Sequence, residues 1–363
     1  MSPTGQGTPL PQALASWLDR HAEALDTSAD LAAQVVPQLA QAGLFGRGVP
    51  AELGGRGGTV GDAIDAIAAV AERSLTAAFV FWGHRTFIEY LLKSPNEAVR
   101  ERWLGAMLRG ERGGATGLSN AMKYLSGIEA LQIDATATAG GWRLDGGLAW
   151  VTNLRKEGFV AAAAVTAPDG APPAVVAFAG DSAGVTRSAD LNLLALRGSN
   201  TAAVQLANVR LDAADVIAPD ARAWLPGVRP AFLGMQCAMS VGLARASLAA
   251  AQQRAPDVRG LAARATALQD ALASHAHALR EGAIDGRFVK DAAPLFRLRI
   301  GLAELVQDAA LLELQASGGR AYLLDHDPNF ARRWREAAFV PIVTPSLTQL
   351  QIELEKRAAA GGA

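Results

Sequence analysis

Trp150, Val151 and Thr152 are the residues whose types and order first suggest chemistry. They stand near the end of the stretch Gly140–Asn153, whose sequence is GGWRLDGGLAWVTN. Side chains alternate between the two faces of a β-strand, so Trp150 and Thr152 share one face and Val151 points to the other. An indole beside a hydroxyl suits a flat heteroaromatic ligand, because the indole stacks while the hydroxyl donates a hydrogen bond to a ring nitrogen. The simpler interpretation is an edge tryptophan that covers a small core.

Histidines supply the other candidate chemistry. His84 follows Trp82 by two residues in an apolar segment, where it either serves a ligand or is a core histidine bonded to the backbone. His275 and His277 are spaced i, i+2, so on a helix they point about 200° apart and do not form a metal pair. His326 stands in the sequence DHDP, which is typical of a solvated turn, and the alternative is a contact with the substrate. No metal-ligand spacing, serine nucleophile elbow or Cys-x-x-Cys motif occurs.

Composition narrows the class of protein. The chain has 363 residues, of which 50% are hydrophobic and 19% charged, and its net charge of −1 leaves no electrostatic footprint for nucleic acid. The single cysteine, Cys237, excludes an internal disulfide and suits a reducing compartment. Residues 1–14 lack the pattern of a signal peptide, and no apolar run reaches the roughly 18 residues of a membrane span. We therefore expect a soluble, cytoplasmic protein.

Three regions must position these residues. Periodicity predicts an N-terminal α-helical domain over 1–112, a middle antiparallel β-barrel or sandwich over 113–219, and a C-terminal helical bundle over 220–363. The triplet Asp145-Gly146-Gly147 predicts a tight hairpin turn before the strand that carries Trp150. The predicted helices cover 14–25, 28–42, 62–72, 75–92, 96–108, 232–253, 261–280, 292–316 and 349–360, and the predicted strands cover 128–138, 142–144, 148–152, 159–165, 174–178, 184–188 and 203–209.

Further motifs stand at intervals along the chain. Residues 42–57 are AGLFGRGVPAELGGRG, residues 196–201 and 204–209 are LRGSNT and VQLANV, and residues 315–322 are QASGGRAY, with REA at 335–337. In this order and spacing, and together with WVTN at 150–153, the motifs resemble those of the acyl-CoA dehydrogenase superfamily over nearly the whole chain. The resemblance implies a mainly α fold with a central β domain: an N-terminal helical domain, a middle antiparallel β-barrel or sandwich, and a C-terminal four-helix bundle.

The resemblance also implies a cofactor and an assembly. FAD, with FMN as the alternative, would lie where the three domains and two subunits meet, in a homodimer or homotetramer. His84 would lie on the helix that lines the substrate side of the flavin, where it could hydrogen-bond or protonate a flavin–oxygen species. The expected cofactor contacts are Thr116, Leu118 and Ser119 in a loop after the first strand; Trp150, Val151 and Thr152 against the isoalloxazine; Gln315, Gly318 and Gly319 toward a neighbouring subunit's cofactor; and Ser346 and Thr348 near the C-terminus.

Two departures from the family pattern change the expected chemistry. Counting from the REA motif, the usual catalytic glutamate falls on Thr344, whose hydroxyl stays protonated near neutral pH and cannot remove an α-proton. The other place used by relatives, residues 225–233, also lacks a carboxylate, and no Asp or Glu lies between Ala337 and Ile352. The loop Gln253–Gly260 lacks the family's cofactor-binding Arg and Phe-Gly, although Arg254 or Arg259 could meet a phosphate.

Three functions follow from this combination. The first is an FAD-dependent oxidoreductase of the acyl-CoA dehydrogenase type with an unusual or displaced base. The second is a reduced-flavin-dependent monooxygenase on the same scaffold, and the third is a catalytically inactive flavin- or ligand-binding member. The expected partners are a small-molecule substrate, such as an acyl-CoA, and an electron-transfer flavoprotein or a flavin reductase. Neither nucleic acid nor a membrane is expected as a partner.

Overall fold

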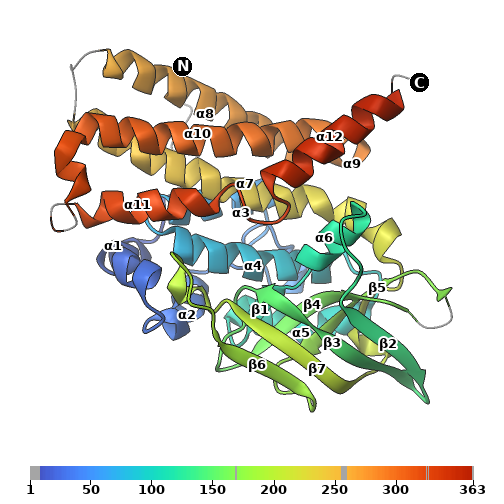
Figure 1. The fold of residues 1–363 in the computed structure, drawn as a ribbon. Coiled ribbons are helices and arrows are strands. Elements are labelled where there is room, and N and C mark those ends of the chain that lie inside the picture. Colours follow the sequence, from blue (N-terminus) through green and yellow to red (C-terminus); the bar gives the residue numbers. More distant parts are fainter. Residues whose placement is uncertain (1–8, 168–169, 255–259, 324, 326, 362–363) are drawn as a thin grey trace.

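The computed structural model describes residues 9–167, 170–254, 260–323, 325 and 327–361. Two predictions, a phosphate contact by Arg259 and a solvated turn at His326, concern residues outside these ranges. The chain is mainly α-helical, with a central β region built of two sheets (Figure 1), as the sequence predicts. Among the described helices, none combines the length and the hydropathy that crossing a lipid bilayer requires.

All five predicted N-terminal helices are present. They are α1 (Gln12–Thr27), α2 (Ala32–Gln41), α3 (Val60–Ala71), α4 (Leu75–Leu92) and α5 (Glu97–Arg109), with the short 3-10 helix η1 (Ala51–Leu53) between α2 and α3. Helix α4 is buried on every side from Leu75 to Leu91, because its sequence is apolar all round. Ser74 caps its start, since the hydroxyl accepts a hydrogen bond from the Ala77 amide at 3.3 Å. In Figure 1, α4 lies between α7 and the two sheets.

Two four-stranded sheets form the β region. Their strand orders are β1-β4-β5-β8 and β2-β3-β7-β6, and β1 and β4 pair in parallel while the other pairs are antiparallel. A hydrophobic core that includes Leu144, Leu148 and Phe178 draws residues from both sheets. The elements are β1 (Gly113–Thr116), α6 (Ser119–Leu125), β2 (Ile133–Thr138), β3 (Gly141–Val151), β4 (Phe159–Val165), β5 (Ala174–Ala179), β6 (Val185–Asp190), η3 (Arg197–Ser199), β7 (Ala202–Leu211), η4 (Ala213–Asp215) and β8 (Val216–Ala218).

The hairpin turn predicted at Asp145-Gly146-Gly147 is wrong. Strand β3 runs through these residues, and its register against β7 shifts between Leu144 and Gly146, which marks a β-bulge. Gly146 has a φ of 134°, and a Cβ there would lie 2.2 Å from the Gln132 carbonyl oxygen, so the bulge needs glycine. The turn between β2 and β3 comes earlier, at Gly140, with Thr138 paired to Gly141. Glycine therefore permits two conformations that the sequence alone does not distinguish.

The C-terminal helices pack over α3 and α4. They are α7 (Ala221–Arg254), α8 (Leu261–Ile284), α9 (Arg287–Lys290), α10 (Ala293–Ser317), α11 (Pro328–Phe339) and α12 (Leu347–Gly361), with η5 (Gly318–Tyr322) after α10. Helix α7 is apolar and largely buried, as predicted. The sequence missed α6, α9 and α11, which are short or rich in charge, and the short strands β1 and β8. Helix α11 has two buried arginines, Arg332 and Arg333, so its packed face does not stand out as apolar.

Candidate active site

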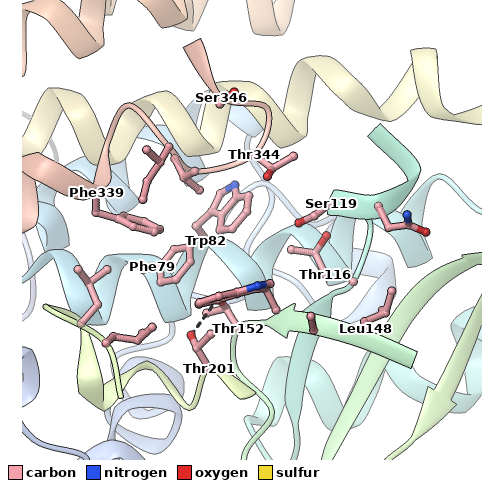
Figure 2. Close-up of a pocket in the computed structure, with 18 of the residues that line it drawn as sticks. Phe79, Trp82, Thr116, Ser119, Leu148, Thr152, Thr201, Phe339, Thr344 and Ser346 are labelled. Atoms are coloured by element: carbon pink, nitrogen blue, oxygen red, sulfur yellow. Dashed lines mark hydrogen bonds between the residues drawn. The ribbon is translucent and has the colours of Figure 1, made fainter. Parts of the chain in front are cut away.

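A cavity of about 600 Å³ opens where the end of β3 meets α4, α6 and the segment after α11 (Figure 2). This volume falls within the range of about 300–1,000 Å³ usual for small-molecule sites. The cavity walls come from all three regions of the chain, so the fold must be complete before the cavity exists.

Trp150 and Thr152 form one wall. Both line the cavity, whereas Val151 between them is buried in the core between the sheets, as strand alternation predicts. Trp150 is 64% exposed, an unusual fraction for so large an apolar side chain. The Thr152 and Thr201 hydroxyls are hydrogen-bonded at 3.2 Å, and the Thr201 hydroxyl is also hydrogen-bonded to the Ser199 hydroxyl at 2.8 Å. A flat ligand resting on Trp150 would therefore meet a hydroxyl held by its neighbours.

The turn from β1 into α6 supplies two more hydroxyls. Thr116 and Ser119 line the cavity, and Thr116 is fixed by a 2.8 Å hydrogen bond with the buried Tyr90 hydroxyl. Burial raises the pKa of Tyr90, so this phenol stays protonated. At Gly117 a Cβ would lie 2.5 Å from the Ala162 carbonyl oxygen, so this turn packs against β4 through glycine. Leu118, predicted as a cofactor contact, is instead buried in the core and does not line the cavity.

The segment after α11 closes the opposite side. Thr344 and Ser346 line the cavity, whereas Thr348 is exposed and lies outside it. Gln236 donates a hydrogen bond to the Thr344 carbonyl at 2.9 Å and accepts one from the Arg299 Nε at 3.0 Å. Arg299, fully buried, also donates to the Val340 carbonyl at 2.5 Å. Two side chains from α7 and α10 thus hold the backbone at both ends of the segment 340–344.

Three charged side chains line the cavity among the residues that the structure describes, and each has a partner. Lys123 lies 3.3 Å from Glu129 across the loop after α6. Arg335 on α11 bonds to Asp26 at 2.8 Å and to Glu23 at 2.9 Å. Glu129, the carboxylate in this lining set, also accepts a hydrogen bond from the Asn120 amide. The carboxylate of the described lining, that of Glu129, is therefore held by Lys123 and Asn120.

His84 does not reach the cavity, contrary to the expectation from the sequence. Its ring is fully buried and stacks on Phe45 at 3.8 Å between centroids. Its Nδ1 accepts a hydrogen bond from the Gly114 amide at 3.0 Å, and its Nε2 lies 2.9 Å from the Met107 carbonyl, to which it donates. Both ring nitrogens are occupied by backbone, so His84 ties α4 to α5 and β1 instead of acting on a ligand.

His84 makes protein stability sensitive to acid. Burial lowers its pKa to about 4, from about 6.5 in the unfolded chain. The folded state binds fewer protons, so the stabilisation is complete above pH 6.5 and is lost as the pH falls toward 4. We expect the free energy of unfolding to drop by about 2 kcal/mol between pH 7 and pH 5. Denaturant titrations of wild type and His84→Gln test this, because the variant should show a flatter dependence; equal slopes would contradict it.

The residues predicted to approach a neighbouring subunit's cofactor lie away from this cavity. Gln315, Gly318 and Gly319 are exposed around the end of α10, and the Gln315 amide oxygen accepts a hydrogen bond from Arg264 at 3.2 Å. Arg254 nearby is already bonded to Glu313, Ser317 and Asp327. A separate cavity of about 310 Å³ lies beside Arg254 and Ser317. A role for these residues across a subunit interface stays a prediction.

The sequence missed one side of the cavity. Phe79 and Trp82 of α4, Leu194 before η3, and Phe339 and Ile342 around the end of α11 line it. Phe79 and Trp82 are spaced i, i+3, so one face of α4 presents both. That spacing was visible, but every face of α4 is apolar, and periodicity could not show which face meets a cavity.

Comparison with known proteins agrees with this architecture. Residues 12–111 match the model of the acyl-CoA dehydrogenase N-terminal domain. The whole chain resembles the structure of glutaryl-coenzyme A dehydrogenase in its glutaryl-CoA complex, with a TM-score of 0.79 and 17% identity over 98% of this chain and 97% of that one. The N-terminal helical region therefore matches the acyl-CoA dehydrogenase N-terminal domain, and the whole chain has the acyl-CoA dehydrogenase fold.

Other solved structures resemble the chain to a similar extent. KijD3, solved in complex with FMN and dTDP-3-amino-2,3,6-trideoxy-4-keto-3-methyl-D-glucose, has a TM-score of 0.79 and 21% identity over 96% of this chain and 91% of that one. Dibenzothiophene monooxygenase (TdsC) from Paenibacillus sp. A11-2 has a TM-score of 0.78 and 16% identity over 94% of each chain. A search of curated proteins returned no match. At these identities the likeness establishes the acyl-CoA dehydrogenase fold and leaves the reaction open.

Proposed function

We propose that this protein is a flavin-dependent oxidoreductase that binds FAD, with FMN as the alternative, in the cavity lined by Trp150 and Thr152. The observation that carries the proposal is the exposed indole beside a hydroxyl at the end of β3, inside a cavity of about 600 Å³. Structures of similar fold include one solved with FMN and one of an FAD-dependent dehydrogenase.

The residues present fit a flavin ring. Its face suits the exposed Trp150 indole, and its polar edge suits hydroxyls such as those of Thr116, Ser119 and Thr152, which line the same cavity. Among the described residues that line the cavity, each charged side chain has a partner of opposite charge, so none places an unpaired charge against the neutral flavin ring. A bound flavin supplies two-electron transfer to or from the substrate and, when reduced, reaction with O₂. The protein's contribution is to stack, hydrogen-bond and orient the flavin.

The reaction type depends on the absence of a base. An acyl-CoA dehydrogenase removes a proton from the substrate, and Thr344 lines the cavity where the sequence count places that base. A threonine hydroxyl does not ionise near neutral pH. Glu129 comes from the loop after α6 and is paired with Lys123. This combination favours the second candidate, a reduced-flavin-dependent monooxygenase, which needs no carboxylate to abstract an α-proton.

Anaerobic flavin reduction separates the two reactions. The protein is reconstituted with FAD or FMN, acyl-CoA thioesters are added without oxygen, and bleaching of the flavin spectrum is followed. Bleaching would establish dehydrogenation and rule out the monooxygenase. Substrate turnover only when reduced flavin and O₂ are supplied together would establish monooxygenation and rule out dehydrogenation. A chain that retains neither FAD nor FMN would overturn the proposal as a whole.

Thr344→Glu sharpens the same comparison. If the cavity admits a thioester, a carboxylate at residue 344 is expected to accelerate flavin bleaching by acyl-CoA about 10²- to 10⁴-fold, the usual contribution of a general base. Thr348→Glu is the matched control, because Thr348 is exposed and lies outside the cavity lining. If Thr344→Glu bleaches no faster than wild type while still holding flavin, the cavity does not bring a thioester within reach of residue 344.

A further inference from the structure

One part of the cavity is apolar, and we call it the apolar half. It consists of Phe79, Trp82, Leu194, Phe339 and Ile342. The Phe79 and Trp82 rings are 5.5 Å apart between centroids and only 6° from parallel, and the Phe339 ring meets Phe79 edge-on at 4.8 Å. Figure 2 shows these three rings grouped on one side, opposite Thr116 and Ser119. The cavity therefore has an aromatic side and a hydroxyl side.

Two polar groups of the residues beside the apolar half, the Trp82 indole N–H and the Arg335 guanidinium, are already occupied. The Trp82 indole N–H donates to the Phe232 carbonyl at 3.1 Å, so it is not free for a ligand. Arg335, on the same helix as Phe339, is neutralised by Asp26 and Glu23. A charged group placed in the apolar half would lose its hydration without gaining a partner from these residues, and such transfers are costly.

The cavity also presents exposed apolar side chains. Among the described large hydrophobic residues, Tyr322, Leu194, Ile342 and Trp150 are the four most exposed, at 86%, 75%, 68% and 64%. The last three of these line this cavity, and they come from three separate segments of the chain. Exposed apolar surface gathered from separate segments marks a binding site. Burying it would favour an apolar ligand that reaches the cavity mouth.

We propose that the substrate is an uncharged, flat and apolar molecule, a neutral aromatic compound, which packs in the apolar half against Phe79, Trp82 and Phe339. This inference rests on the proposed function, since it assigns the flavin to Trp150 and the hydroxyl side, and the substrate to the remaining space. The parallel Phe79 and Trp82 rings and the edge-on Phe339 ring offer flat apolar faces, and the Trp82 indole N–H is already bonded to the Phe232 carbonyl. A flat neutral aromatic compound therefore fits this half of the cavity better than a charged one.

Matched ligands test the substrate class. The flavin-loaded protein is titrated with 2-naphthol, with its anionic analogue 2-naphthoate and with butyryl-CoA, and binding is followed by calorimetry and by the flavin difference spectrum. We expect 2-naphthol to bind at least about tenfold more tightly than 2-naphthoate. Equal or tighter binding of 2-naphthoate or butyryl-CoA would overturn the inference. Flavin retention is measured first from the visible spectrum, so a failure of the proposed function is recognised separately.

Ile342→Asp locates the binding site. A carboxylate at the cavity mouth is expected to weaken 2-naphthol binding about tenfold or more, while the flavin content per chain stays unchanged. Ile284→Asp is the matched control, because Ile284 is 39% exposed at the end of α8 and does not line the cavity. Unaltered 2-naphthol affinity in Ile342→Asp, or equal weakening in both variants, would place the ligand elsewhere and contradict the inference.

Discussion

Replacing Trp150 with alanine is expected to raise the flavin dissociation constant about 10- to 100-fold without lowering thermal stability. The indole lines the cavity and is 64% exposed, so its removal leaves little unfilled space in the core. A stacked aromatic pair contributes about 0.5–1.5 kcal/mol beyond the buried area. The area of the ring face adds to this, and about 1.4 kcal/mol corresponds to each tenfold change in affinity. Fluorescence titration with FAD and FMN measures the change.

Trp334→Ala is the control for this prediction. Trp334 is also partly exposed, at 45%, but it lies on α11 and does not line the cavity. Its removal should leave the flavin dissociation constant unchanged. If Trp150→Ala binds flavin as tightly as wild type, the cofactor does not stack on this ring. That result would contradict the proposal that flavin binds in this cavity.

Glu313→Gln is expected to reduce the free energy of unfolding by about 3–5 kcal/mol. Glu313 is fully buried on α10. Its carboxylate accepts a hydrogen bond from the Arg333 Nε of α11 at 2.9 Å and another from Arg254 of α7 at 3.1 Å. Removing one partner of a buried ion pair leaves the other charge uncompensated, and this typically costs about 3–5 kcal/mol. Glutamine preserves the volume, so the loss reports the charge and not a cavity. Denaturant titration measures it.

A surface pair on the same helix provides the control. Asp308 lies 3.7 Å from Arg264, and both side chains are about half exposed, at 52% and 42%. Asp308→Asn should therefore change the free energy of unfolding by less than about 1 kcal/mol. A similar loss of unfolding free energy in the two variants would contradict the prediction that the buried Glu313 charge stabilises the fold. Because α11 leads directly into the segment that lines the cavity, Glu313→Gln should also weaken ligand binding before the fold is lost.

The placement of the cavity wall could be predicted from the sequence because it depends on local geometry. Alternation along a strand sends Trp150 and Thr152 to one side and Val151 to the other whatever the rest of the fold. Thr116, Ser119 and Ser346 were named by resemblance, and they also line the cavity. The long helices were visible because fifteen or more residues repeat an apolar pattern. These signals need no knowledge of which elements pack together.

The rest depends on contacts between distant segments. His84 stands within an apolar helix whether it faces a ligand or the core, and only its bonds to Met107 and Gly114 decide between them. The glycines at 146 and 147 permit a turn or a bulge, and pairing with β7 selects the bulge. The aromatic group of Phe79, Trp82 and Phe339 joins residues more than 250 positions apart. No pattern within one segment shows that these residues come together.

Equilibrium binding of flavin tests the central claim most directly. The flavin-free chain is titrated with FAD and with FMN, and the visible spectrum and the tryptophan fluorescence are followed together. We expect saturable binding of one flavin per chain, with a shifted visible spectrum and with quenching of tryptophan fluorescence that is reduced in Trp150→Ala. Absence of saturable binding by either flavin up to about 1 mM would contradict it.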